Sequence, residues 1–167
     1  MMPYAAIARR MTAALGLCLI STASFAGGYG GGSNGHSAIA PREAQAILAY
    51  ADSYSDGDFR VRHTETAGAT ARTGADGETG YGYGSSDTQI EGGDGTKSWK
   101  RSVQRSSGHA ENGSTSASGF SASFVKVRSA DGRCYMFKGY ASVGAAAGPG
   151  GTTTQTSGVA KSVGGRY

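Results

Sequence analysis

The sequence predicts a mainly β protein of the α+β class, in which one N-terminal helix packs on one face of a long-stranded antiparallel β-meander. Asp-Gly or Asn-Gly dipeptides, which favour the positive φ angles of two-residue hairpin turns, recur every 18 to 20 residues. The segments between them are rich in Ser, Thr, Val and aromatic residues, as expected of strands. One short segment before them has helical spacing. The turn dipeptides are Asp56-Gly57, Asp76-Gly77, Asp94-Gly95, Asn112-Gly113 and Asp131-Gly132.

The first 26 residues have the pattern of a secretory signal peptide. Arg9 and Arg10 form a positively charged start, the run over 11–20 is almost wholly apolar, and small residues precede the expected cleavage near Ala26. The apolar run is too short for a membrane span. We therefore expect the chain to be secreted or periplasmic, with no transmembrane span in its mature part. The formal net charge falls from +4 to +2 when the two arginines are removed.

After the signal peptide at 1–26, a Gly/Ser-rich segment over 27–40 is expected to be flexible, and 41–167 to form a single helix-plus-meander domain. The helix is predicted over 41–54, because a proline suits its first turn and apolar residues follow at positions i, i+3, i+4 and i+7. These residues are Pro41, Ala44, Ile47, Leu48 and Ala51.

Five strands are predicted between the turns, with a weaker sixth at the end, either as an open meander or curled into a partial barrel. Each dipeptide, taken as a two-residue hairpin loop, fixes which residues of neighbouring strands pair. Because side chains alternate between the two faces of a sheet, this pairing also assigns each side chain to a face. The strands are expected at 58–73, 78–92, 96–110, 114–129, 133–147 and 152–166.

The predicted pairing collects most apolar side chains on one face. Large apolar residues lie toward the end nearest the helix, and the other half offers mainly Ala, Gly and Ser. This predicts a thin, weakly buried extension, or contact with another surface. Val125, Val127 and Met136 are exceptions on the polar face. The apolar face carries Phe59, Val61, Ala67, Ala69, Ala71, Ile90, Trp99, Val103, Phe120, Ala122, Phe124, Tyr135, Phe137, Ala141, Val143, Ala145 and Ala147.

One polar cluster is predicted on the apolar face, from His63 and Glu65 on the first strand and Arg101 and Arg105 on the third. Across the strand between them, Glu65 and Arg101 would lie about 10 Å apart at the backbone, which long side chains can span. Such a set is a candidate ligand-binding site for an anion, or an acid–base group. The alternative is an ordinary ion pair, since surface pairs are common and weak.

A run of basic residues surrounds the single tryptophan, Trp99. Lys97, Lys100, Arg101 and Arg105 would contact a phosphate or an acidic polysaccharide if they shared one surface. Strand alternation instead divides them between two faces, which favours a solvated strand with one buried tryptophan.

Two smaller features are candidates for contacts. Tyr81 and Tyr83, flanked by glycines on the polar face, would contact a sugar ring or a neighbouring chain, unless they are ordinary exposed aromatics. Cys134, the cysteine left after signal removal, is either a buried strand residue or the site of an intermolecular disulfide. The histidines lack metal-ligand spacing and turn chemistry explains the aspartates, so neither a metal nor a cofactor is expected.

The sequence carries no recognisable catalytic constellation, so we expect no enzyme. The favoured function is an exported, non-enzymatic structural, adhesive or partner-binding module of the cell envelope or extracellular space. The expected partner is a second copy or another envelope or extracellular component and, given the small net charge, not a nucleic acid. The alternative is a small periplasmic ligand-binding protein that uses the anion site described above. A hydrolase of unrecognised type is the third hypothesis.

Overall fold

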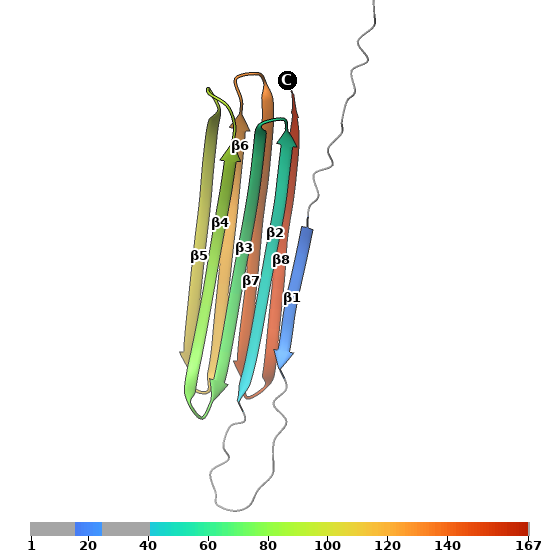
Figure 1. The fold of residues 1–167 in the computed structure, drawn as a ribbon. Coiled ribbons are helices and arrows are strands. Elements are labelled where there is room, and N and C mark those ends of the chain that lie inside the picture. Colours follow the sequence, from blue (N-terminus) through green and yellow to red (C-terminus); the bar gives the residue numbers. More distant parts are fainter. Residues whose placement is uncertain (1–15, 25–40, 167) are drawn as a thin grey trace, which may run out of the picture.

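The turn dipeptides fold the chain into two four-stranded antiparallel sheets that pack face to face (Figure 1). The computed structural model describes residues 16–24 and 41–166, with side chains over 41–166. The two sheets confirm the mainly β class. The predicted single meander, open or curled into a partial barrel, is wrong. The first sheet has the order β1-β2-β3-β4, with β1 (Gly16–Ser24), β2 (Arg42–Asp56), β3 (Phe59–Gly74) and β4 (Gly77–Glu91). The second has the order β5-β6-β7-β8, with β5 (Lys97–Glu111), β6 (Ser114–Arg128), β7 (Arg133–Gly148) and β8 (Gly151–Arg166).

The six predicted strands are present as β3 to β8, and each of their ends lies within one residue of the prediction. The turn glycines adopt the positive φ that the dipeptides predict, for example 64° at Gly57 and 87° at Gly132. Strand β1 coincides with part of the predicted signal peptide, and its backbone pairs with β2 from Gly16 opposite Ala51 to Ser24 opposite Glu43. The predicted flexible segment over 27–40 lies outside the described residues.

The helix predicted over 41–54 is wrong, because these residues form β2. Residues at i and i+4 share a face in a strand as well as in a helix, so Ala44 and Leu48 fit both periods. Pairing with β3 along the whole length of β2 decides for the strand. Ile47 and Ala51, which the helix needs on the same face, are half-buried and exposed. The side chains buried against the second sheet are instead Ala44, Ala46, Leu48, Tyr50 and Asp52.

The predicted register is correct for the face assignment in two hairpins. The β3–β4 pairing is shifted by two residues from the prediction, which leaves each side chain on its predicted face and puts Val61 opposite Ile90. The β5–β6 pairing is as predicted, with Arg101 opposite Phe124. Asp94-Gly95, in contrast, does not form a hairpin, because it joins β4 to β5 and these strands lie in different sheets.

The β6–β7 hairpin is shifted by one residue, which exchanges the faces of β5 and β6 relative to β7. The cause is a three-residue loop: Ser129 donates its N–H to the Arg133 carbonyl (2.9 Å), and Gly132 donates to the Ser129 carbonyl (3.2 Å). A glycine at positive φ closing such a loop is a common alternative to a two-residue turn. The predicted exceptions Val125 and Val127 are therefore buried. The residues corrected to the outer face are Trp99, Val103, Phe120, Ala122 and Phe124.

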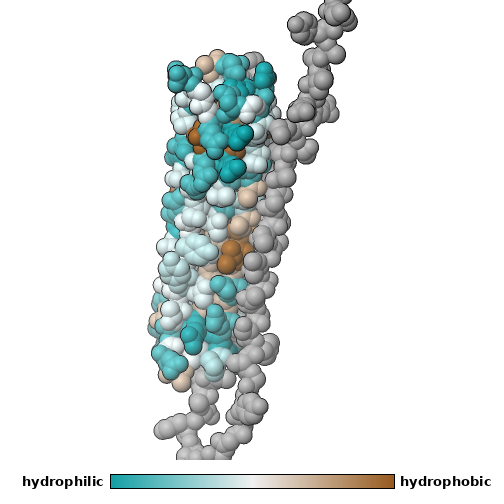
Figure 2. All heavy atoms as spheres, viewed as in Figure 1, coloured by the Kyte–Doolittle hydropathy of each residue, from teal (hydrophilic) through white to brown (hydrophobic). Residues whose placement is uncertain are grey.

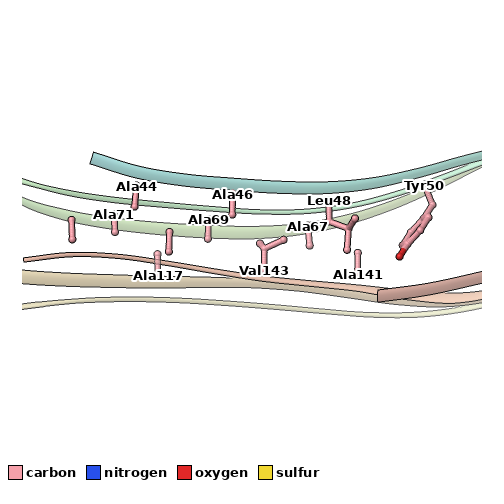
Figure 3. Close-up of a cluster of buried hydrophobic side chains, with 12 residues drawn as sticks. Ala44, Ala46, Leu48, Tyr50, Ala67, Ala69, Ala71, Ala117, Ala141 and Val143 are labelled. Atoms are coloured by element: carbon pink, nitrogen blue, oxygen red, sulfur yellow. The ribbon is translucent and has the colours of Figure 1, made fainter. Parts of the chain in front are cut away.

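The core between the sheets has a small-residue half and a large-residue half, as the sequence predicts. In the small half, alanines of β2 and β3 point toward Ala117, Ala141 and Val143 of the second sheet (Figure 3). The half predicted to be a thin extension is thus covered by the second sheet of the same chain. The large half consists of Phe59, Val61, Val125, Val127, Tyr135 and Phe137.

The two sheets approach to backbone contact where β4 lies over β6. A Cβ atom added at Gly82 would lie 1.8 Å from the carbonyl oxygen of Ser118. One added at Gly84 would lie 2.0 Å from that of Phe120. Real Cβ atoms essentially never approach so closely, so only glycine fits these inward-facing positions. The alternate glycines of β4 are therefore what allows the sheets to meet.

Charged groups join the two sheets at the end where the β2–β3 and β6–β7 turns meet. The guanidinium of Arg133 pairs with Asp58 (2.5 Å) and with Asp131 (2.9 Å). Arg166 on β8 pairs with Asp56 at 2.7 Å. These contacts hold the pKa of each of the three carboxyl groups below the usual 3.8.

We expect the free energy of unfolding to fall as the pH decreases from about 4 toward 2. The pKa of Asp131 is about 2, chiefly because the Ser129 hydroxyl and then Arg133 donate to its carboxylate, and Arg133 lowers that of Asp58. A carboxyl group whose pKa is lower in the folded state stabilises that state at pH values above the unfolded-state pKa. This stabilisation is lost as the pH falls through the folded-state value.

Urea denaturation at pH 5, 4, 3 and 2 measures this dependence. Arg133→Gln is expected to flatten the curve between pH 4 and 2, because the guanidinium is the chief cause of the lowered pKa of Asp58 and, after the Ser129 hydroxyl, contributes to that of Asp131. Arg62→Gln, an exposed arginine of β3, serves as the control and is expected to keep the slope of the unmodified protein. An unchanged slope in Arg133→Gln would contradict the assignment.

Candidate functional site

The structure does not bring the four predicted ligand-binding residues together. His63 and Glu65 are buried between the sheets, as their place on the apolar face of β3 predicts. Arg101 and Arg105 are exposed on the outer face of the second sheet, because the Asp94-Gly95 connection crosses between sheets instead of forming a hairpin. A common site for all four residues is therefore wrong in geometry, and we do not propose one.

His63 and Glu65 instead belong to a buried polar network with Ser123 and Thr88. The Nδ1 atom of His63 lies 2.9 Å from the Thr88 hydroxyl, and its Nε2 atom lies 3.0 Å from the Ser123 hydroxyl. Ser123 donates to Glu65 Oε2 at 2.7 Å, and that oxygen lies 3.9 Å from His63 Nε2. The imidazole packs on Phe137, with ring centroids 4.0 Å apart. Sequence reasoning missed Ser123 because its hairpin was predicted one residue out of register.

Ser123, His63 and Glu65 are the residue types of a serine hydrolase triad, but their order does not support that chemistry. In a triad the serine passes its proton to the imidazole while the carboxylate holds the other ring nitrogen. Here the carboxylate accepts from the serine itself, and Thr88 occupies the other nitrogen. The side chains of His63 and Glu65 are fully buried, so a substrate cannot reach them. The network is thus a structural part of the core.

A second buried pair supports this assignment. Tyr135 donates its hydroxyl to Asp52 at 2.9 Å inside the sandwich. Burial, followed by the charge of Asp52, raises the pKa of Tyr135 well above its usual 10. The phenol therefore stays protonated at any physiological pH and acts as a fixed hydrogen-bond donor.

The outer face of the second sheet is the most distinctive surface of the molecule. Large apolar side chains are exposed there, including Trp99 at 49%, Val163 at 55% and Val159 at 47%. Long basic side chains alternate with them along the strands. We call this surface the basic apolar face; it consists of Trp99, Arg101, Val103, Arg105, Phe120, Phe124, Lys126, Lys138, Tyr140, Val159, Lys161 and Val163.

Strand pairing arranges this face in rows across all four strands. One row contains Arg101, Phe124, Lys138 and Lys161, and the next contains Val103, Ala122, Tyr140 and Val159. The rings of Phe120 and Tyr140 stack with centroids 6.4 Å apart, and Lys126 Nζ lies 5.8 Å from the Trp99 ring centroid. A shallow groove of about 760 Å³ runs between these rows. Its lining includes Arg101, Phe124, Lys138, Tyr140, Val159 and Lys161.

The basic apolar face carries a one-sided charge, although the whole chain has a small net charge. Besides its named cations, Lys97 and Arg128 point outward from the same face. Among its described residues the acidic one is Glu111, at the far end, where it lies 3.2 Å from His109. The first sheet differs, since the outer face of β2 to β4 is largely hydrophilic where Figure 2 shows it, and it pairs Arg60 with Glu91 at 3.7 Å. The excess of positive charge is thus local.

The remaining sequence candidates lie away from the basic apolar face or within the fold. Tyr81 is 62% exposed on the outer face of β4, and Tyr83 is half-buried with its ring over Gly68. The two rings lie 6.1 Å apart. Cys134 is buried near the start of β7, and its intermolecular disulfide stays a prediction.

Sequence reasoning flagged Trp99 with its basic neighbours and missed the other three strands of the face. A signal was present in the alternation of lysines with apolar residues, as in Phe124 and Lys126, or in Val159, Lys161 and Val163. Residues two apart share a face of a strand, so this spacing already joins charge and apolar surface. Only the correct β6–β7 register places all four strands' contributions together.

Comparisons with family models, curated proteins and solved structures find no match for this chain. Within 16–24 and 41–166, no helix is long and apolar enough to cross a membrane. No group of His, Cys, Asp or Glu suited to a metal ion occurs among the same residues. The chain is a two-sheet antiparallel sandwich with one basic, partly apolar outer face.

Proposed function

We propose that the protein is an exported, non-enzymatic binding module of the cell envelope or extracellular space, and that it binds an anionic partner through the basic apolar face. The observation that supports this proposal is the one-sided charge of that face, combined with apolar side chains that the fold leaves exposed. Monomeric proteins rarely expose large contiguous apolar patches unless these mark an interaction site.

The non-enzymatic part of the proposal is supported by the buried polar groups. His63, Glu65 and Ser123 would be the natural residues for acid–base or nucleophilic chemistry, and the core encloses them. The exposed residues of the basic apolar face are cations and apolar side chains. Such a surface suits binding by charge and contact area rather than proton transfer at neutral pH.

Salt elution from a dextran sulfate resin tests the proposal with the full chain. Arg101→Gln/Lys138→Gln/Lys161→Gln removes three cations from one row of the basic apolar face and is expected to elute at clearly lower salt than the unmodified protein. Fewer cations on a polyanion release fewer counterions, so the salt dependence also becomes shallower.

A matched control is offered by the first sheet. Arg60→Gln/Arg62→Gln/Arg72→Gln removes the same charge from the outer face of β3, and is expected to leave elution nearly unchanged. Equal shifts for the two triple variants would mean that net charge, and not this face, controls binding. That result, or no retention of the unmodified protein, would overturn the proposed function.

A further inference from the structure

The chemistry of the basic apolar face argues against a second copy of the chain as its occupant. Two such faces brought together would place lysines and arginines opposite each other, and like charges at an interface cost affinity. Glu111, the acidic residue of this face, lies at its far end and is already hydrogen-bonded to His109. The occupant must therefore be anionic.

Polysaccharides and nucleic acids account for the cations and aromatic rings of this surface, but not for its exposed valines. Both stack on aromatic rings, which Trp99, Phe124 and Tyr140 supply. The exposed valines Val159 and Val163 offer no ring for stacking. The groove residues also include no carboxylate or carboxamide side chain, the groups that pair with the edges of cytosine and adenine. Half-exposed aliphatic side chains gain most from a partner with an apolar interior.

An anionic lipid bilayer accounts for both the cations and the apolar side chains of this face. Trp and Tyr are the residues that favour the headgroup region of a membrane, and Lys and Arg reach phosphates while their methylene stems lie on apolar surface. The rows of the second sheet offer this combination, since Arg101, Lys138 and Lys161 share a row with Phe124, and the next row ends in Val159. Four strands spaced about 4.8 Å apart form a flat surface about 14 Å wide.

We infer that the basic apolar face binds the surface of a bilayer that contains anionic phospholipid. The second sheet lies parallel to the membrane, its aromatic and valine side chains enter the headgroup region, and its cations contact lipid phosphates. The first sheet, with its hydrophilic outer face, points away from the lipid (Figure 2). This inference rests on the proposed function, because it names the class of anionic partner for the same face.

The single tryptophan provides a direct readout, because Trp99 is part of the basic apolar face and half-exposed. With vesicles of phosphatidylglycerol and phosphatidylcholine, the full chain is expected to co-sediment and its tryptophan emission to shift to the blue. With pure phosphatidylcholine vesicles, neither effect is expected. Each basic residue near an anionic surface contributes enough that the Arg101→Gln/Lys138→Gln/Lys161→Gln variant should bind about 100-fold more weakly.

Two variants separate the contributions of charge and apolar contact. Val159→Ser/Val163→Ser keeps every cation, and is expected to weaken vesicle binding while leaving elution from dextran sulfate unchanged. Arg60→Gln/Arg62→Gln/Arg72→Gln, altered on the opposite sheet, is expected to bind vesicles like the unmodified protein. Equal vesicle binding by the valine variant and the unmodified protein would overturn the apolar part of the inference.

The same protein samples distinguish failure of this inference from failure of the proposed function. Retention on dextran sulfate without vesicle binding or an emission shift would overturn the lipid assignment and leave the proposed function standing. Tight binding to a single-stranded oligonucleotide without vesicle binding would likewise overturn the lipid assignment, in favour of a nucleic acid. No binding to any of the three probes would overturn both proposals.

Discussion

Gly82→Ala is expected to lower the free energy of unfolding by about 3 kcal/mol, at the upper end of the usual cost of overpacking a core. The added methyl group would lie 1.8 Å from the carbonyl oxygen of Ser118. That atom belongs to the backbone of β6, which is paired on both sides within its sheet, so it cannot move aside as a flexible side chain would. The two sheets must separate locally, and the alanine-rich contacts around them are lost.

Urea denaturation measures this effect, and Gly150→Ala is the matched control. Gly150 lies in the β7–β8 turn, where an added Cβ atom has nothing within 4 Å. Its substitution is expected to leave the denaturation midpoint nearly unchanged, because alanine there neither collides nor needs a positive φ. Similar midpoints for the two variants would contradict the close sheet contact over β4.

His63→Leu is expected to cost about 3 kcal/mol of unfolding free energy, because it removes the ring that hydrogen-bonds the buried polar groups around Glu65. Glu65 would retain its hydrogen bond from Ser123, while its other oxygen, Oε1, has no hydrogen-bond partner. The hydroxyl of Thr88 would lose its ring nitrogen partner as well. The substitution therefore leaves the hydroxyl groups of Thr88 and Ser123 without their ring nitrogen partners.

A double-mutant cycle isolates this coupling. His63→Leu/Glu65→Leu removes both polar side chains, and is expected to recover most of the stability lost in His63→Leu, since apolar replacement of both partners of a buried polar pair is often neutral or better. The measurement is the unfolding free energy of the two single variants and the double variant in urea. Simple addition of the single costs would show that the two residues do not interact.

The strands could be predicted from the sequence because each turn has its own chemical signal. Asp or Asn before glycine marks a change of direction wherever it occurs, and the strand ends follow. The β2 segment had no such contrast: Ala44 and Leu48 fit a helix and a strand equally well. Only the partner strand β3, brought alongside by Asp56-Gly57, decides between them.

The candidate site was harder to predict, because face assignment depends on every intervening turn. A two-residue error at the β3–β4 turn left His63 and Glu65 correctly inside. The three-residue loop before Arg133 moved the pairing by one residue and exchanged the faces of β5 and β6 relative to β7. The local sequence does not distinguish a three-residue loop from a two-residue turn here, since Asp131-Gly132 fits either one. The assembled basic apolar face therefore appears only with the full set of strand pairings.

Every residue of β5 is exposed to solvent, and the strand forms hydrogen bonds only with β6 in its sheet. The amide groups that point away from β6 should thus exchange with deuterated water fastest among the strands of the second sheet. Yet β5 supplies Trp99 and Arg101 to the basic apolar face. Ligand binding should slow this exchange, so that a variant with higher affinity should also show slower amide exchange in the edge strand β5.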